Sequence, residues 1–306
     1  MNPFGEVQLI RSEVFGSLPE RYRGVRPPTP WVQVQRNGKH SDCVFEGPAF
    51  LRDGSLLVSD IPWGRIFRIQ PDGSMDLVVE YDGEPNGIAV RPDGTAAVAD
   101  MKNGIMLLDP AAGTIESLLP RAEVEGFKGV SDLVYAPNGD LYFTDQGLTG
   151  MHDPTGRAYR LAADGAVTRL ISTLPSPNGI VIDAAGEVLY IAATRANAVW
   201  RAPLLASGEA TKVGIHVQLS GGHGPDGLAF DAAGNLAVAH VGAGRILVFS
   251  PHGDLIAVVE SATGPTVTNV AFGIQPGWMY FTEAESGTVL RAPWDHAAQT
   301  PYSHTT

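Results

Sequence analysis

The chain has 306 residues, of which 44% are hydrophobic and 18% charged, so it has enough apolar side chains for a large core and too few charges for a disordered chain. Its net charge of −12 excludes nucleic acid as an expected partner, because an acidic surface repels phosphate backbones. No apolar run approaches the roughly 18 residues needed to cross a membrane, and from the composition of the N-terminal stretch we expect no secretory signal. Cys43 is the only cysteine, which excludes an internal disulfide and favours a cytoplasmic location. We expect Cys43 to be a small buried side chain.

Six segments of the chain share one layout, in which two short apolar runs are joined by a glycine turn. They begin near residues 46, 86, 131, 178, 226 and 269, and in each the turn glycine follows eight positions after the first residue. The runs are rich in Val, Ile, Leu, Phe and Tyr, as strands require. A further strand pair usually follows, as in the stretches 64–73, 156–165 and 244–253. Four strands in a period of about 45 residues are typical of a propeller blade.

The repeats predict an all-β fold, a six-bladed β-propeller with four-stranded antiparallel blades, in which residues 1–306 form a single domain. No linker divides the chain. The stretch VQVQR (32–36) alternates like a strand, and we expect it to complete the last blade and close the ring. Closure of this kind removes an exposed sheet edge.

The first residue of every repeat is polar and opens the strand nearest the propeller axis. The spacing predicts that these six side chains lie at equivalent depth around a central channel: Glu46, Asn86, Ser131, Asn178, Asp226 and Asn269. All six offer oxygen, and calcium takes six to eight oxygen ligands from carboxylates, amides and water. The lack of Cys and His among them argues against zinc or copper. We therefore expect Ca²⁺ or another divalent cation, and the alternative is a hydrated polar channel without an ion.

The loops at the channel mouth are expected to form the wall of a pocket above the ion. The predicted substrate-binding residues include two of the channel residues, Asn86 and Asn269. The others are Trp63, Met101, Asp145, His152 and Arg195. Their mixed, partly apolar character favours a small-molecule substrate.

These residues carry a resemblance to a known family. The stretches that resemble the SMP-30/gluconolactonase/LRE-like propellers are FEGPAF (45–50), SDLVYAPNGDLYFTD (131–145), PTGRAYRL (154–161), SPNGIVID (176–183) and GPDGLAFDAAGNLAVAH (224–240). The resemblance covers about residues 40–295 and implies a metal held by Glu46, Ser131, Asn178 and Asp226. Ser131 stands where the family usually has asparagine, and serine is a shorter and poorer ligand. The resemblance also implies hydrolysis of a small lactone, with phosphotriesters as side or specialised substrates.

In this family the residue at Asp226 is both a metal ligand and the candidate general base. His240 and His152 are alternative catalytic bases, because histidine titrates near neutral pH. The favoured alternative for either histidine alone is a hydrogen-bonded structural or loop residue. Two other functions stay open: a phosphotriesterase, and a calcium-binding propeller without catalytic activity.

Overall fold

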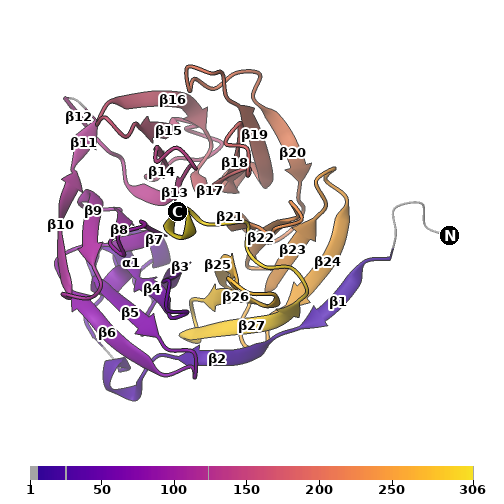
Figure 1. The fold of residues 1–306 in the computed structure, drawn as a ribbon. Helices are drawn as coiled ribbons and strands as arrows, with labels where there is room; N and C mark the ends of the chain where they lie inside the picture. The colour runs from indigo at the N-terminus through magenta and orange to yellow at the C-terminus, as the bar shows by residue number, and fades with distance from the viewer. Residues whose placement is uncertain (1–5, 25, 123, 306) are drawn as a thin grey trace.

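The six repeats fold into six sheets arranged around one axis, so the predicted six-bladed β-propeller is confirmed (Figure 1). This computed structural model describes residues 6–24, 26–122 and 124–305. Residues 1–5, 25, 123 and 306 of the predicted domain lie outside the described residues. The turn at Gly54 shows why each repeat begins with a hairpin: its φ is +84°, a conformation that glycine adopts without steric cost.

In every blade the strands follow one another outward from the axis. Blade 1 contains β3 (Phe45–Phe50), β4 (Leu56–Asp60), β5 (Arg65–Ile69) and β6 (Met75–Glu80). Blade 2 contains β7 (Pro85–Val90), β8 (Ala96–Asp100), β9 (Gly104–Asp109) and β10 (Thr114–Leu119). Blade 3 contains β13 (Val130–Tyr135), β14 (Leu141–Asp145), β15 (Gly156–Leu161) and β16 (Val167–Leu174), and it follows a short hairpin of β11 (Arg121–Ala122) and β12 (Glu125–Gly126).

The second half of the chain repeats this order. Blade 4 contains β17 (Pro177–Ile182), β18 (Val188–Ala193), β19 (Ala198–Pro203) and β20 (Gly214–Gln218). Blade 5 contains β21 (Gly224–Phe230), β22 (Leu236–Val241), β23 (Arg245–Phe249) and β24 (Leu255–Glu260). Blade 6 contains β25 (Val267–Phe272), β26 (Gly277–Glu283) and β27 (Thr288–Trp294).

The N-terminal segment completes the ring with two strands. Strand β2 (Glu13–Ser17) pairs antiparallel with β27 and becomes the fourth strand of blade 6. Strand β1 (Gln8–Arg11) pairs parallel with β24 and adds a fifth strand to blade 5 (Figure 1). Closure by an N-terminal strand occurs as predicted, but the strand was placed wrongly at residues 32–36.

Residues 30–36 instead form the helix α1 (Pro30–Arg36). Thr29 caps its first turn by accepting a hydrogen bond from the Val32 amide, and Pro30 occupies the first helical position, where its missing N–H costs nothing. Asn37 ends the helix with a φ of +50°. These end signals outweigh the alternation of VQVQR, which is too short to distinguish a strand from a helix.

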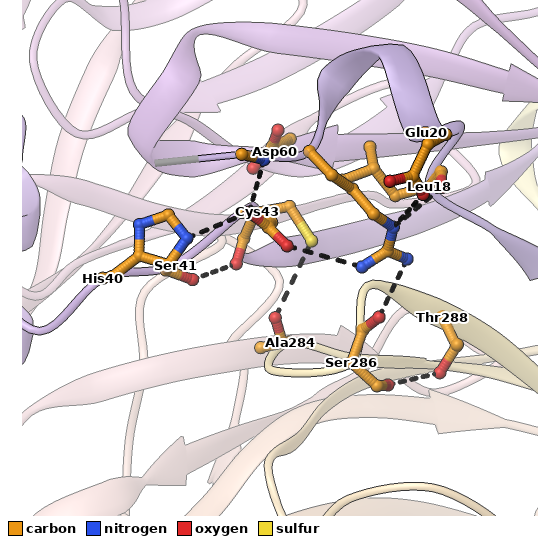
Figure 2. A network of polar contacts seen from close by, with 12 residues as sticks. Leu18, Glu20, His40, Ser41, Cys43, Asp60, Ala284, Ser286 and Thr288 are labelled. Carbon is orange, nitrogen blue, oxygen red and sulfur yellow. Dashed lines mark hydrogen bonds and ion pairs between the residues drawn. The ribbon is translucent and has the colours of Figure 1, made fainter. Parts of the chain in front are cut away.

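Polar contacts attach the segment before blade 1 to blade 6, and Figure 2 shows this junction. The Arg23 guanidinium donates to the carbonyl oxygens of Leu18 and Ser286, at 3.3 and 3.1 Å. The Cys43 thiol contacts the Ala284 carbonyl at 3.8 Å, and burial raises the pKa of the thiol well above its usual range. Cys43 is thus the small buried side chain that the sequence predicts.

Among the described residues, the apolar core lies between neighbouring blades in six clusters, one at each blade-to-blade interface, and a small seventh cluster lies under α1. Phe281 of blade 6, for example, packs in one cluster with Val248 and Val259 of blade 5. Packing of sheet on sheet leaves the axis itself as a channel. Among the described residues no helix is long and apolar enough to cross a membrane.

The C-terminal segment lies over the centre of the propeller (Figure 1). Arg52 of blade 1 holds it, because its guanidinium donates to the carbonyl oxygens of Ser303 and Thr305 at 2.6 and 3.1 Å. Hydrogen bonds from a charged donor contribute about 1.5–3 kcal/mol each. We expect Arg52→Ala to speed amide hydrogen exchange in residues 299–305 by roughly tenfold. Arg169→Ala, which removes only an exposed ion pair with Glu125, should leave that exchange rate unchanged; equal rates in both variants would contradict the role of Arg52.

Candidate functional site

Side chains at the starts of the innermost strands meet across the blades. Ser131 Oγ donates to Asn178 Oδ1 at 2.8 Å and accepts from Asn86 Nδ2 at 3.3 Å, so blades 2, 3 and 4 are joined at one level. Asn178 in turn lies close enough to the carboxyl of Asp226 on blade 5 to lower its pKa. Hydroxyl groups on the second strands hold the backbone of the next blade's innermost strand in place. Ser59 donates to the Asn86 carbonyl, and Thr144 donates to the Asn178 carbonyl.

A β-bulge shapes all six innermost strands in the same way, since the pairing of the first two strands shifts beside the channel in every blade. Bulges of this kind re-aim side chains. In each innermost strand, the residue after the one that pairs with the second strand at Asp60, Asp100, Asp145, Ala193, His240 or Glu283 lies at equivalent depth. We call these six residues the ring: Glu46, Asn86, Ser131, Asn178, Asp226 and Thr268.

The prediction that Asn269 lies at the depth of the ring is wrong, because Thr268 occupies that place. The pairing shows the cause: Phe272 pairs with Met279 in blade 6, whereas Phe50 pairs with Leu56 in blade 1. The turn of blade 6 therefore has one residue more, and this residue precedes its glycine, so counting back from Gly277 gives the wrong residue.

Asn269 lies one residue deeper, at the level of Asp132 on the opposite blade. The other four blades have glycine at this level: Gly47, Gly87, Gly179 and Gly227. A Cβ at Gly87 would come within 2.0 Å of Asp132 Oδ1, and one at Gly227 within 2.0 Å of Asn269 Oδ1. The glycines therefore leave the space that the two side chains occupy. We call Asp132 and Asn269, which lie beneath the ring close enough for Asn269 to lower the pKa of Asp132, the crossbar.

Asp132 was missed by sequence reasoning, although a signal for it existed. Four of the six ring residues are followed by glycine, and the two exceptions mark the crossbar. The crossbar also reaches the ring, because Asn269 Nδ2 donates to Glu46 Oε2 at 2.8 Å. The Gly47 amide donates to the same oxygen at 3.0 Å, so the orientation of the Glu46 carboxyl is fixed from below.

Three buried carboxyl groups share this site, and burial raises the pKa of each. The pKa of Glu46 rises to about 7, against hydrogen bonds from Asn269 and Gly47 that lower it. The pKa of Asp132 rises to about 8 through burial and the nearby Glu46 charge. The pKa of Asp226 rises well above its usual range, through burial and then the charges of Glu46 and Asp132. The protein alone does not compensate three negative charges here.

The donor set suits a hard cation with oxygen ligands. Asp226 Oδ1 is buried without a hydrogen-bond partner in the described structure, and a buried polar atom of this kind is costly unless something binds it. In residues 6–24, 26–122 and 124–305, no three His, Cys, Asp or Glu side chains form a metal-binding group by themselves. Amide and hydroxyl oxygens would therefore have to complete the coordination, which is typical of calcium rather than zinc.

Two predicted pocket residues lie together at the channel mouth. A Cβ at Gly150 would lie 3.2 Å from His152 Nδ1 and 3.6 Å from Arg195 Cγ, so both side chains flank this glycine. Both are exposed. The positive charge of Arg195 lowers the pKa of Asp226, which shows that its field reaches the ring.

Met101 and Trp63 contact the N-terminal segment. Trp31 of α1 donates from Nε1 to Met101 Sδ at 3.1 Å, and both pack on Val44, Ile61 and Ala284. Helix α1 thus rests on loops of blades 6, 1 and 2, and Trp31 is a residue of this face that sequence reasoning missed.

Trp63 donates from Nε1 to the Ser41 carbonyl at 3.3 Å, and the guanidinium of Arg26 lies 5.1 Å from the centre of its ring. Substrate contact by Trp63 or Met101 stays a prediction.

Asp145 and His240 occupy equivalent positions at the ends of second strands, and both fix the loop that precedes an innermost strand. Asp145 is fully buried, and its Oδ1 accepts from the amides of Lys128 and Gly129 at 2.7 and 2.9 Å. The His240 ring is buried and its Nε2 lies 3.0 Å from the Gly221 carbonyl oxygen. Burial lowers the pKa of His240, which favours the neutral ring. The substrate-binding and catalytic roles predicted for these residues remain predictions.

The crossbar gives a testable effect on cation binding. Asn269→Leu keeps the number and branching of the side-chain heavy atoms but removes the amide that donates to Glu46 Oε2. Loss of an outer partner of a metal ligand typically lowers affinity 10- to 100-fold, so we expect the dissociation constant for calcium to rise by about tenfold, measured by isothermal titration calorimetry. Asn138→Leu, in an exposed turn, serves as the control. Unchanged affinity in Asn269→Leu would show that the crossbar does not support the ring.

Comparison with known proteins finds the family that the sequence motifs resemble. The family model described as "SMP-30/Gluconolactonase/LRE-like region" matches residues 44–285. Lactonase drp35 of Staphylococcus aureus is 30% identical over 239 residues, which cover 73% of this chain and 70% of that protein. A gluconolactonase of Zymomonas mobilis is 28% identical over 278 residues, which cover 80% of this chain and 77% of that protein.

Solved structures share the fold. The calcium-binding protein regucalcin from Agrobacterium tumefaciens matches with a TM-score of 0.78 and 21% identity, over 98% of this chain and 100% of that one. A gluconolactonase from Xanthomonas campestris matches with a TM-score of 0.72 and 22% identity, over 82% of this chain and 86% of that one. The family model spans all six ring residues, and the chain belongs to the SMP-30/gluconolactonase/LRE-like family.

Proposed function

We propose that this protein is a calcium-dependent hydrolase that opens the ester ring of a small lactone. The observation that carries the proposal is the group of three buried carboxyls in the channel, with Asp226 Oδ1 left unpartnered in the described structure. Lactonase drp35 and the gluconolactonase of Zymomonas mobilis supply the reaction class. The regucalcin match supports calcium as the cation.

Glu46, Asn178 and Asp226 would hold the cation with carboxylate and amide oxygens. Ser131 sits between Asn86 and Asn178 and fixes the orientation of the Asn178 amide through its 2.8 Å hydrogen bond to the amide oxygen. A short hydroxyl at this place leaves room for a water, so Ser131 acts as a ligand either directly or through that water. When bound, the cation polarises the ester carbonyl and stabilises the negative charge that develops on its oxygen.

Asp226 acts as the general base in this proposal. Its carboxylate takes a proton from the attacking water as the new C–O bond forms at the carbonyl carbon. The same proton passes to the ring oxygen as the ester bond breaks, so the product is a hydroxy acid and Asp226 is regenerated. Burial raises the pKa of Asp226 in the metal-free fold, and a bound cation lowers it again, so the carboxylate is ionised and able to accept a proton when the cation is present.

Arg195 and His152 would bind the substrate at the mouth. The Arg195 guanidinium attracts the carboxylate that forms on ring opening, and His152 beside it offers a hydrogen bond. His152 and His240 remain the alternative bases. Asn86, which lies in the ring, would contact the substrate from the channel side.

The proposal is tested by a substrate panel on the purified protein with and without calcium. We expect hydrolysis of small lactones, followed by pH-stat titration of the acid released, and much weaker hydrolysis of aryl phosphotriesters. Inactivity on every lactone, aryl ester and phosphotriester despite intact calcium binding would instead support a non-catalytic calcium-binding propeller.

A further inference from the structure

The loop between the second and third strands of blade 3 is the longest of its kind in the propeller. It comprises residues 146–155, ten residues, whereas the equivalent loops of the other five blades have three or four. It lies at the ring end of the blade, because Asp145 just before it pairs with Val130, the residue that precedes Ser131. Loops on a rigid scaffold commonly carry the side chains that bind a ligand. We call residues 146–155 the blade 3 loop.

The blade 3 loop borders the channel mouth from blade 2 to blade 4. A Cβ at Gly129 would lie 3.5 Å from Gly147 Cα and 3.6 Å from Met101 Cε, so the start of the loop lies beside Met101. A Cβ at Gly150 would lie 3.6 Å from Arg195 Cγ, so the middle of the loop lies beside the residue whose charge reaches the ring. The loop therefore connects the apolar and the cationic parts of the mouth.

Hydrogen bonds hold the blade 3 loop in one shape. Gln146 Nε2 donates to Ser176 Oγ at 3.1 Å. Thr149 Oγ1 donates to the Gln146 carbonyl at 2.7 Å and accepts from the Ser176 amide at 3.2 Å, so the loop is attached to the segment that enters blade 4. Two backbone hydrogen bonds between Gly150 and Asp153, of 3.0 and 3.1 Å, close its tip. A ligand that binds such a preformed surface has little loop ordering to offset.

This loop buries a polar side chain and exposes two large apolar ones. Thr149 is 6% exposed, whereas Leu148 and Met151 are 66% and 68% exposed. Single exposed apolar side chains are ordinary, but two within four residues at the mouth of a pocket indicate a surface that a ligand covers. The unbranched thioether of methionine adapts to the shape of such a ligand. The fold of the loop does not use these two side chains, so they are free to contact a substrate.

We propose that Leu148 and Met151 determine specificity by contacting an alkyl chain on the lactone ring. This inference rests on the proposed function and names its substrate class, a small lactone with an uncharged alkyl substituent. The ester faces the cation, and the alkyl chain lies outward along the blade 3 loop, where its removal from water is favourable. A sugar lactone would place hydroxyl groups against the same side chains, and these hydroxyl groups would lose hydrogen bonds to water.

The test compares γ-nonalactone with γ-butyrolactone, which has the same ring without the pentyl chain. We expect the kcat/KM of the unaltered protein to be at least about tenfold higher for γ-nonalactone. In the double variant L148S/M151Q, KM for γ-nonalactone should rise about tenfold with kcat unchanged, because a contact with the chain stabilises the bound substrate and the transition state equally. The kinetic constants for γ-butyrolactone should change far less, since this lactone has no chain to lose.

The matched control is L205S, which changes a leucine that is 50% exposed in the turn between β19 and β20, at the opposite end of blade 4. It should keep the preference of the unaltered protein for γ-nonalactone. The melting temperature of each variant shows whether the fold is kept, and the comparison of lactones on the unaltered protein needs no variant.

Two results would overturn this inference and leave the lactonase proposal standing. One is an unaltered protein that hydrolyses γ-butyrolactone or glucono-δ-lactone better than γ-nonalactone, after subtraction of the uncatalysed rates. The other is a loss in L148S/M151Q that is equal for γ-nonalactone and γ-butyrolactone, which would mean that the loop acts only on the structure of the site. An unaltered protein that hydrolyses no lactone would refute the proposed function, and this inference would fall with it.

Discussion

Asp226→Asn is expected to lower kcat/KM for lactone hydrolysis by at least about 1,000-fold, because it removes the general base and one cation ligand together. Initial rates at saturating calcium would measure this. The fold should be kept, since the amide has the shape of the carboxyl. Burial already disfavours the Asp226 charge, so the metal-free variant should melt at or above the temperature of the metal-free parent protein.

Asp164→Asn, in an exposed turn of blade 3, is the matched control and should have full activity. If Asp226→Asn keeps more than a tenth of the activity of the parent, Asp226 is not the base, and His152 and His240 become the next residues to substitute.

Removal of calcium is expected to abolish activity and to destabilise the protein most strongly at alkaline pH. Glu46 and Asp132 have pKa values of about 7 and 8 in the metal-free fold, against about 4 in an unfolded chain. Between these values the folded state binds more protons than the unfolded state, so the free energy of unfolding falls as pH rises from about 4 to 8. Calcium binds the ionised groups and offsets this loss.

Melting temperatures with EDTA and with excess calcium, at pH 5.5 and pH 8, measure the effect. At a calcium concentration of 100 times the dissociation constant the stabilisation is about 2.7 kcal/mol, or roughly 5 °C, and we expect the larger shift at pH 8. Sodium chloride at the same ionic strength is the control. A calcium shift that is absent, or that is larger at pH 5.5, would contradict the placement of the cation among these carboxyls.

The fold was predictable because each repeat carries its own local signals. Gly54 and the other turn glycines set the hairpins, and the apolar runs beside them set the strands. The depth of five ring residues followed from the same spacing. Asn269 was placed wrongly because a single extra residue in the turn of blade 6 shifts the count, and only strand pairing reveals such an insertion.

The crossbar, the position of α1 and the position of the C-terminal segment over the channel depend on contacts between distant parts of the chain. Asp132 follows Ser131 directly, yet its approach to Asn269 on the opposite blade depends on the geometry of the closed ring. Trp31 reaches Met101 only because α1 forms and lies on the loops, and the short stretch around it alternates like a strand. Hydrogen bonds from the C-terminal segment to blades 4 and 6 likewise have no signature in sequence spacing.

Anomalous diffraction from calcium-soaked crystals tests the central claim most directly. One ion should appear inside the ring, with the carboxylate oxygens of Glu46 and Asp226 and the amide oxygen of Asn178 at roughly 2.3–2.6 Å from it. A map without a peak between these three side chains at saturating calcium, or with the ion bound only elsewhere on the protein, would contradict the account.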